Sequence, residues 1–332
     1  MKKISLLICL VSLVLFSCST SYISLQVLKP AQFTVTQDIK TICVLNRTHL
    51  KRRGELVNLL TNVVDNQPLG LNWQNAKTVI DQFVTDMTAN SPRFKINPLS
   101  IDTIYGTGNI NFPVPLEINT VAKICAIDNA QGLVSLEAFE VRPKITYSQS
   151  GATITCTAVY QTTLGWRFYD PKNGQMIDEY KYTYSKTFTG TGTTQALANK
   201  NLPSTQNCLN EVLIPAANSY VARISPVYEN VSRAFHKKGS PVIESGYLLT
   251  QKNDWKGAAD IWLQEMANPN PKIAGMASYN IAISFEVLGN LNDALVWAKK
   301  ADGLKTKWAK NYIQILNTRI TELNQARAQL GN

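Results

Sequence analysis

The stretch TITCTAVYQTTLGWRFYDPKNGQMIDEYKYTY, residues 153–184, decides the fold class of the amino-terminal part of the chain. In its first half threonine alternates with apolar residues, and in its second half tyrosine alternates with polar or charged residues. Alternation with a period of two predicts strands that have one buried and one solvated face. Between the halves, Asn173-Gly174 supplies the positive φ that a tight turn needs. We therefore expect a long β-hairpin.

The same hairpin has a second interpretation. Strands of about ten residues can span a bilayer, so a tyrosine-rich hairpin is also what a subunit of an oligomeric pore would contribute. A lipid-facing strand surface should be continuously apolar, and Arg167, Lys181 and Lys186 break that continuity. We therefore favour a sheet in a globular domain and keep the pore as an alternative.

Further strands and helices surround the hairpin. Apolar, β-branched runs predict strands at residues 23–28, 39–45, 93–96 and 133–141. Apolar residues at three- and four-residue spacing predict helices at residues 74–89, 121–128, 207–224 and 226–238. The Thr-, Gly- and Asn-rich segment 187–205 is predicted to be a loop. Residues 18–238 are thus predicted to form a mixed α/β domain that ends in helices.

The carboxy-terminal residues, 239–332, predict an all-α domain with an internal repeat. Five positions recur after 36 residues: Leu249, Asn253, Trp255, Ala258 and Trp262 align with Phe285, Gly289, Leu291, Ala294 and Ala298. This spacing resembles a tetratricopeptide repeat, in which small residues let paired helices approach. The alternative is a generic helical bundle. We expect a final helix at residues 306–329 and packing of the repeats on the helices of residues 207–238, so that the fold class is α+β.

The first residues resemble a bacterial lipoprotein signal. Lys2 and Lys3 precede an apolar run at residues 4–16, and Leu15-Phe16-Ser17-Cys18 resembles a lipobox. Thirteen helical residues reach only about 20 Å, less than the hydrocarbon core of about 30 Å. We expect residues 1–17 to be removed as a signal peptide and Cys18 to be acylated. An ordinary signal peptide with an incidental cysteine is the alternative.

The charge of the chain favours acidic partners. The formal net charge is +10, and removal of Lys2 and Lys3 would make it +8. A positive surface attracts anionic lipid or acidic proteins, and an exported protein rarely meets nucleic acid, so no nucleic-acid partner is expected. The candidate partner-binding residues are Lys299, Lys300, Lys305, Lys307 and Lys310, which have Asp302 as their single acidic neighbour. The alternative is a solvated lysine face that keeps the helix soluble.

The sequence lacks recognisable catalytic motifs. It contains no phosphate-binding loop, no HExxH, no GxSxG and no closely spaced CxxC. The two histidines, His49 and His236, lie far apart, and Asp178 and Glu179 should point to opposite faces of one strand. We expect no enzymatic activity, catalytic residue, metal site or cofactor, although a glycosidase-like pair of distant carboxylates stays open.

Two modification questions stay open at this stage. Cys43, Cys125, Cys156 and Cys208 allow three disulfide connectivities, or they are buried thiols that act as small hydrophobic side chains. Asp102-Thr103-Ile104 resembles the short O-glycosylation acceptor of exported Bacteroidota proteins, which makes Thr103 a candidate sugar site.

The chain as a whole resembles an uncharacterised family of Bacteroidota lipoproteins with a tetratricopeptide-like tail. The matching segments are Lys29-Pro30-Ala31 and residues 42–47, 133–139, 166–171, 223–226 and 255–262. The resemblance implies architecture and an outer-membrane address. The absence of an acidic run after Cys18 favours the periplasmic side. We expect a membrane-anchored, non-catalytic scaffold or adaptor that binds a protein partner through the helical repeat, with a secretion or pore component and a cell-envelope polymer hydrolase as alternatives.

Overall fold

A computed structural model gives the fold of residues 20–48, 69–97, 104, 106–108 and 110–331. The predicted signal peptide, Cys18, His49 and Thr103 lie outside these described residues. The chain divides into two compact units: unit 1 comprises Met1–Lys29 and Tyr228–Ala326, and unit 2 comprises Pro30–Val227 and Arg327–Asn332. The boundary expected at residue 238 therefore lies about ten residues earlier, and the first strand belongs with the carboxy-terminal helices.

Unit 2 contains a five-stranded mixed sheet in the order β3-β2-β4-β5-β6. Its strands are β2 (Thr41–Asn46), β3 (Lys95–Asn97), β4 (Gly132–Ser150), β5 (Thr153–Asp170) and β6 (Gln175–Gly192). Strand β2 is parallel to β3 and β4, and β4, β5 and β6 are antiparallel. The predicted hairpin is confirmed as β5 and β6, joined at Gly174 with a φ of 68°.

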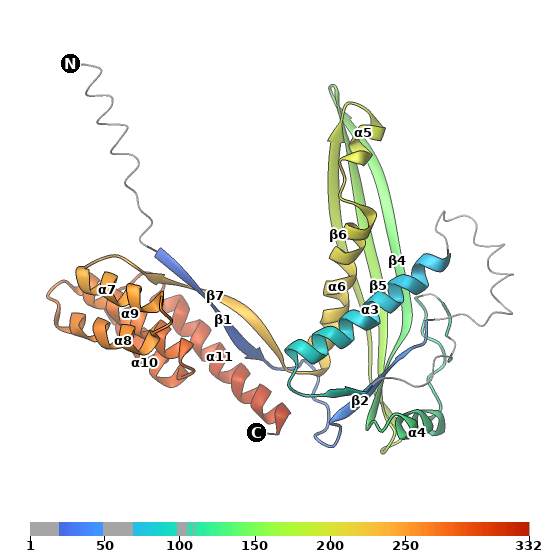
Figure 1. Cartoon of the computed structure of the whole chain (residues 1–332), viewed down its shortest axis with the longest axis horizontal. Coiled ribbons are helices and arrows are strands. Elements are labelled where there is room, and N and C mark those ends of the chain that lie inside the picture. The colour runs from blue at the N-terminus through green and yellow to red at the C-terminus, as the bar shows by residue number, and fades with distance from the viewer. Residues whose placement is uncertain (1–19, 49–68, 98–103, 105, 109, 332) are drawn as a thin grey trace. The chain divides into compact units, whose positions relative to one another are not determined.

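Helices cover both faces of the sheet near β2 (Figure 1). On one face, α3 (Leu69–Asn90) and α6 (Thr205–Ile224) bury the main core, where the ring of Trp166 stacks on that of Tyr220 at 5.1 Å. On the other face, α4 (Ile118–Ile127) packs on β2 and β4. The tyrosines of β6 pack against the α6 side, so the face that a pore hairpin would turn to lipid is occupied.

The segment predicted as a loop at residues 187–205 is largely ordered structure. Strand β6 continues to Gly192, and a short helix, α5 (Gln195–Lys200), folds back on it. A Cβ atom on Gly190 would collide with the carbonyl oxygen of Ala198. The glycines that suggested a loop are therefore there because the helix backbone approaches the strand closely.

Unit 1 begins with a two-stranded sheet of β1 (Thr20–Lys29) and β7 (Val227–His236). The helix predicted at residues 226–238 is therefore wrong. Along β7, Val231, Arg233 and Phe235 alternate toward the interior while Ser232 is exposed, which is a strand pattern. The partner strand lies about 200 residues earlier in the chain, so no local signal announces the pairing.

The rest of unit 1 is helical, as predicted. The helices are α7 (Pro241–Thr250), α8 (Trp255–Leu263), the short 3-10 helix η2 (Gln264–Ala267), α9 (Pro271–Val287), α10 (Leu291–Gly303) and α11 (Ala309–Leu330), whose last residues belong to unit 2. Their core packs on Phe235 of β7, whose ring lies 5.5 Å from Trp255 and 6.4 Å from Trp262. The helical repeats were expected to pack on a helix at residues 226–238, and instead they pack on strand β7.

The 36-residue repeat is visible in the geometry of the two helix pairs. Asn253 and Gly289 both have positive φ, 60° and 81°, at the turns that join α7 to α8 and α9 to α10. The next residue in each copy, Asp254 or Asn290, caps the following helix through its side chain. Ala294 is fully buried, as predicted for a helix contact. None of the helices in the described residues is long and apolar enough to cross a membrane.

Candidate functional site

The predicted lysine cluster is exposed and lies where α10 meets α11. Lys299 and Lys300 lie near the end of α10, Lys305 and Lys307 lie in the connection, and Lys310 is in the first turn of α11. Among the described residues, none of these five ammonium groups has a carboxylate within 4.0 Å, although eleven other ion pairs form. The cluster therefore carries uncompensated positive charge.

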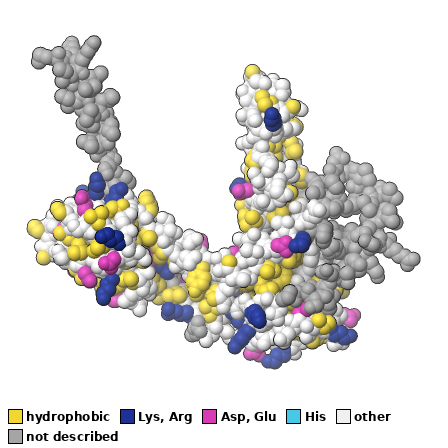
Figure 2. Space-filling view, in the orientation of Figure 1, with side chains coloured by type: hydrophobic (Ala, Val, Ile, Leu, Met, Phe, Trp, Pro, Cys, Tyr) yellow, Lys and Arg dark blue, Asp and Glu magenta, His cyan; other side chains and the backbone are white. Residues whose placement is uncertain are grey.

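Apolar surface adjoins the lysines. On α10, Val296 is 62% exposed, and Lys299 and Lys300 follow it by three and four residues, so the three side chains share one helix face. The Nζ atom of Lys300 lies 4.8 Å from the centroid of the half-buried Trp297 ring. Figure 2 shows hydrophobic side chains interspersed with Lys, Arg, Asp and Glu on the visible face of the α7–α10 helices. Such a mixture is typical of a protein-binding surface.

The connection that carries Lys305 and Lys307 is anchored to the core. Trp308, at a φ of 72°, stacks its ring on buried His236 at 5.1 Å. Burial, and then the positive charge of Lys307, lowers the pKa of His236 to about 4. The stack of Trp308 on His236 therefore fixes the connection that carries Lys305 and Lys307.

A buried carboxylate ties the helices of unit 1 together. Glu286 of α9 is fully enclosed and accepts hydrogen bonds from Arg233 of β7 at 3.0 Å and from Arg319 of α11. The hydroxyl of Tyr312 donates to the same carboxylate at 2.7 Å, and burial raises the pKa of Tyr312. Every oxygen of Glu286 is thus used internally, which indicates a structural role.

Unit 2 holds an equivalent group around Glu137, the residue inserted where β4 bulges between Leu136 and Ala138. Its carboxylate accepts hydrogen bonds from Arg167 at 2.7 Å, Arg47 at 3.3 Å and the Tyr169 hydroxyl at 2.7 Å. The two arginines also donate to the carbonyl oxygens of Pro113 and Val114. The network therefore clamps the segment before α4 onto the sheet.

Sequence reasoning missed both networks. Glu and Arg are ordinarily exposed, so their burial leaves no compositional signal.

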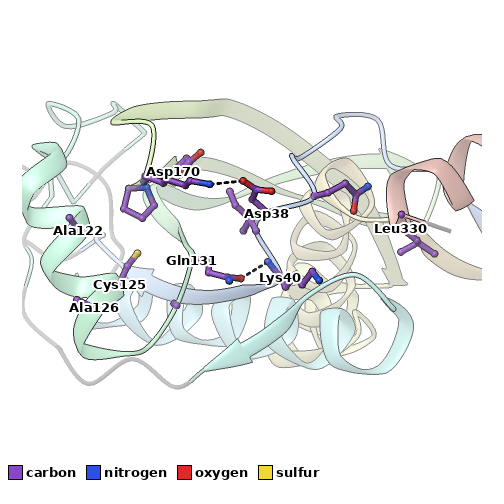
Figure 3. Close-up of a pocket in the computed structure, with 14 residues that line it drawn as sticks. Asp38, Lys40, Ala122, Cys125, Ala126, Gln131, Asp170 and Leu330 are labelled. Atoms are coloured by element: carbon purple, nitrogen blue, oxygen red, sulfur yellow. Dashed lines mark hydrogen bonds and ion pairs between the residues drawn. The ribbon is translucent and has the colours of Figure 1, made fainter.

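A cleft of about 1030 Å³ lies within unit 2 beside α4 (Figure 3). Asp38 and Lys172 form an ion pair at 2.7 Å on its wall. The side-chain oxygen of Gln131 accepts a hydrogen bond from the amide of Lys40 at 2.7 Å. The side chain of Asp170 accepts a hydrogen bond from the backbone amide of Lys172, in the β5–β6 turn, at 2.9 Å. These polar groups hold the wall together, and no nucleophile is paired with a base among them.

The cysteines are buried, and no metal cluster is present in the described part of the chain. Cys43, Cys125, Cys156 and Cys208 are all buried free thiols, as the interpretation as small hydrophobic side chains expects. No group of three or more His, Cys, Asp or Glu side chains among the described residues has the arrangement of a metal site. Cys43 and Cys125 are in one apolar cluster, and Cys125 lines the cleft.

Two family models match the chain. One, described as a domain of unknown function (DUF8603), matches residues 39–236, which is more than half of the chain. The other, also a domain of unknown function (DUF6340), matches residues 244–319. Among curated proteins no sequence matches.

Solved structures show weak likeness. A minor lipoprotein from Acinetobacter baumannii is 8% identical with a TM-score of 0.27, over 55% of this chain and 91% of that one. A provisionally assigned lipoprotein from Caulobacter crescentus is 11% identical with a TM-score of 0.23, over 44% and 77%. A PelC dodecamer from Paraburkholderia phytofirmans is 12% identical with a TM-score of 0.22, over 61% and 99%. At these scores the likeness carries no inference about activity.

Proposed function

We propose that this chain, which belongs to the DUF8603 family of domains of unknown function, is a non-catalytic scaffold of the cell envelope. Its α10–α11 surface, defined as Val296 and Trp297 with the five lysines Lys299, Lys300, Lys305, Lys307 and Lys310, binds an acidic segment of a partner protein. The tetratricopeptide-like pairing of α7–α8 and α9–α10 provides the rigid support.

The observation that carries the proposal is the uncompensated charge beside exposed apolar surface. A solvated lysine face needs no apolar neighbour, whereas an interface needs both an apolar centre and a charged rim. Val296 supplies the centre and Lys299 and Lys300 the rim. The charge would speed encounter with an acidic partner and make the association weaken as salt rises.

Acylated Cys18 would hold the scaffold at the periplasmic face of the outer membrane. Several acyl chains anchor stably, where one chain anchors only marginally. The test is Cys18→Ala, which should leave the chain unprocessed or soluble after detergent phase separation. A processed variant that still partitions into detergent like the wild type would contradict the anchor.

No specific observation favours the two rival functions. The tyrosine-rich face of β6 packs on the α6 side of unit 2, so a pore would require that packing to open. A hydrolase would need a carboxylate pair facing a cleft, and Asp38 and Asp170 in the cleft described above are occupied by Lys172 and by the β5–β6 turn.

The experiment places a photo-crosslinking amino acid at position 296 in cells. A matched control carries it at position 145, since Ile145 is a 50% exposed apolar residue of unit 2. We expect a protein adduct at position 296 that disappears when the five lysines are changed to Glu. A second control changes five exposed lysines of unit 2 to Glu, with the same change in net charge: Lys95, Lys123, Lys144, Lys181 and Lys200.

Two outcomes would overturn the proposal. One is the same set of adducts at positions 296 and 145, or adducts that survive the lysine reversal. The other is lysine-dependent binding of the purified chain to phosphatidylglycerol vesicles with no protein adduct, which would assign the surface to lipid instead.

A further inference from the structure

The end of strand β7 is held against helix α9. The side-chain oxygen of Asn280 accepts a hydrogen bond from the His236 amide at 2.8 Å, and its amide group donates one to the His236 carbonyl oxygen at 2.6 Å. Three residues after His236, a Cβ atom on Gly239 would lie 3.5 Å from the Cδ1 atom of Ile273. The first turn of α9, which contains Lys272, therefore lies beside the residues that follow β7.

Three lysines gather at this end of β7. Lys237 and Lys238 follow the strand directly, and Lys272 is exposed in the first turn of α9. Among the described residues, neither Lys237 nor Lys272 has a carboxylate within 4.0 Å. The carboxylate of Glu265 accepts a hydrogen bond from the Ser240 hydroxyl but belongs to a buried residue, so it offers no exposed acidic group. This end of β7 therefore presents positive charge to the solvent.

The start of β1 lies at the same end of the two-stranded sheet. Four residues beyond the end of β1, the amide of Phe33 donates a hydrogen bond at 2.7 Å to the carbonyl oxygen of Arg223, which is four residues before β7 begins. The end of β1 is thereby close to the beginning of β7, so the paired strands run antiparallel. Both strands have ten residues, so Thr20 at the start of β1 lies near the end of β7 (Figure 1).

Tyr22 adds an exposed aromatic ring near this end. Its side chain is 69% exposed, while the neighbouring Ile23 packs on the core of unit 1. A ring with an apolar body and a polar tip is typical of the boundary between lipid headgroups and hydrocarbon. Cys18 precedes Tyr22 by four residues, and extended chain spans at most about 3.6 Å per residue, so acyl chains on Cys18 would be attached within about 14 Å of Tyr22.

We propose that Tyr22, Lys237, Lys238 and Lys272, here called the β7-end surface, dock on a bilayer that contains anionic phospholipid and so orient unit 1 on the membrane. The inference rests on the acylation of Cys18 in the proposed function. Attachment at one residue sets the distance to the membrane but leaves the chain able to turn. Lysines beside the attachment point supply a second contact, because the negative potential of an anionic leaflet attracts them.

The position of the lysines, and not only their charge, favours a bilayer as the occupant. Acyl chains on Cys18 bring the membrane itself to this end of the sheet, and a lipid anchor together with a basic patch holds more firmly than the lipid alone. The α10–α11 surface borders the β7-end surface: the Nζ atom of Lys307 lies 4.8 Å from the centroid of the Trp308 ring, which stacks on His236. The lysines of the α10–α11 surface are therefore left unchanged in the test.

The experiment reconstitutes the full chain, purified from membranes in detergent, into vesicles of phosphatidylcholine alone or with phosphatidylglycerol. Lysines are acetylated briefly, and mass spectrometry gives the rate at each position. We expect acetylation of Lys237, Lys238 and Lys272 to slow about fivefold with phosphatidylglycerol, which corresponds to roughly 1 kcal/mol per lysine near an anionic surface. The exposed Lys252 and Lys256, beyond the far end of the ten-residue helix α7, are matched controls and should react equally in both kinds of vesicle.

A second readout follows the depth of Tyr22. A fluorescent probe on Tyr22→Cys should be quenched by headgroup-labelled lipid more strongly with phosphatidylglycerol than without it. The control is Tyr228→Cys, because Tyr228 is a 46% exposed tyrosine near the opposite end of the same sheet. Changing Lys237, Lys238 and Lys272 to Gln should abolish the dependence on phosphatidylglycerol, and changing the two control lysines to Gln should preserve it.

Three outcomes would overturn the inference. The first is an equal acetylation rate at the three lysines in both kinds of vesicle. The second is equal slowing at the control lysines, which would mean general adhesion to charged lipid. The third is slowing at the lysines of the α10–α11 surface without slowing at Lys237, Lys238 and Lys272.

Failure of the proposed function would be seen separately. The purified chain contains no partner, so the acetylation rates do not depend on the crosslinking result at position 296. A chain that floats with phosphatidylglycerol vesicles but not with phosphatidylcholine vesicles would lack the acyl anchor on Cys18. That result would contradict the anchor of the proposed function, while slowed acetylation at the three lysines would still support the β7-end surface.

Discussion

The two units bury the same four-residue constellation in different surroundings. Each encloses one glutamate that accepts hydrogen bonds from two arginines and one tyrosine. The members are Glu137, Arg47, Arg167 and Tyr169 in unit 2, and Glu286, Arg233, Arg319 and Tyr312 in unit 1. In unit 2 the carboxylate and its closest arginine lie on adjacent strands, β4 and β5, whose register is already fixed by backbone hydrogen bonds. In unit 1 it connects β7, α9 and α11.

The difference teaches where a buried charge matters most. Helices that pack on one another share no backbone hydrogen bonds, so side chains alone set their positions. Strands carry that information in their backbones. We therefore expect the loss of Glu286 to release whole elements, and the loss of Glu137 to release only the segment at residues 113–116 that its arginines hold.

The largest effect should follow from Glu286→Gln. The change leaves Arg233 and Arg319 buried with a neutral acceptor, which costs about 3–5 kcal/mol of the free energy of unfolding. Urea denaturation followed by hydrogen exchange should show protection lost in β7, α9 and α11 while unit 2 keeps its own. Equal loss of protection in both units would break the comparison.

Lowering the pH should destabilise unit 1 more than unit 2. The pKa of His236 is about 4 in the folded chain and 6.5 in the unfolded one, so the unfolded chain takes up the proton first as pH falls. The stability that this difference in the pKa of His236 gives the folded chain is complete above pH 6.5 and is lost between about pH 6.5 and pH 4. The loss in the free energy of unfolding is at most about 3 kcal/mol.

Exchange measured at pH 7 and pH 4.5 should show α9 and α10 opening, and His236→Phe should remove that dependence by keeping the ring stack on Trp308 without a titrating group. The described residues of unit 2 contain no histidine. A His236→Phe variant with the same acid sensitivity in unit 1 would show that other groups cause it.

A smaller effect is expected from Glu137→Gln. Arg167 keeps its ion pair with Glu179 at 2.6 Å and its hydrogen bond to Pro113, so the cost should be about 2–3 kcal/mol. Exchange should rise at residues 113–116 and stay low along β4 and β5. If exchange also rises along β4 and β5, their backbone hydrogen bonds are not sufficient to hold them without Glu137. The expected contrast with unit 1 is then contradicted.

The smallest effect should come from Ala294→Trp. Ala294 lies at a helix contact with no exposed surface, so a large ring would overpack it and cost about 1–3 kcal/mol. Val296→Trp, two residues along on the exposed face, is the control and should leave the melting temperature unchanged. Similar losses for the two variants would mean that the repeat packs differently.

Local patterns predicted much of this fold. Alternation from residue 153 onward was sufficient for β5 and β6, and it also placed neighbouring acids on opposite faces: Asp178 binds Arg223 of α6, and Glu179 binds Arg167. The repeat spacing aligned Asn253 with Gly289, and both residues have positive φ at the turns between paired helices. These features depend on residues a few positions apart, which a single sequence displays.

The remaining features depend on distant residues. The strand at β7 pairs with β1, which lies about 200 residues earlier in the chain. Of the candidate site, consecutive charge revealed the lysines, but the exposure of Val296 and the stacking of Trp308 on His236 follow from packing. The glutamate networks join residues up to 122 positions apart, counting from Arg47 to Tyr169.

The discontinuity of unit 1 sets an order of events during synthesis. Strand β1 is synthesised before its partner β7, which follows about 200 residues later, and that takes roughly 10–40 s at 5–20 residues per second. During that interval the nascent chain presents an unpaired strand edge, a template for aggregation. Nor can unit 2 close fully before residue 329 has been made, because the side chain of Gln329 pairs with both backbone groups of Ala31 at 2.8 and 3.0 Å. A chaperone that shields β1 would therefore be needed early, and release of the last turn would complete folding.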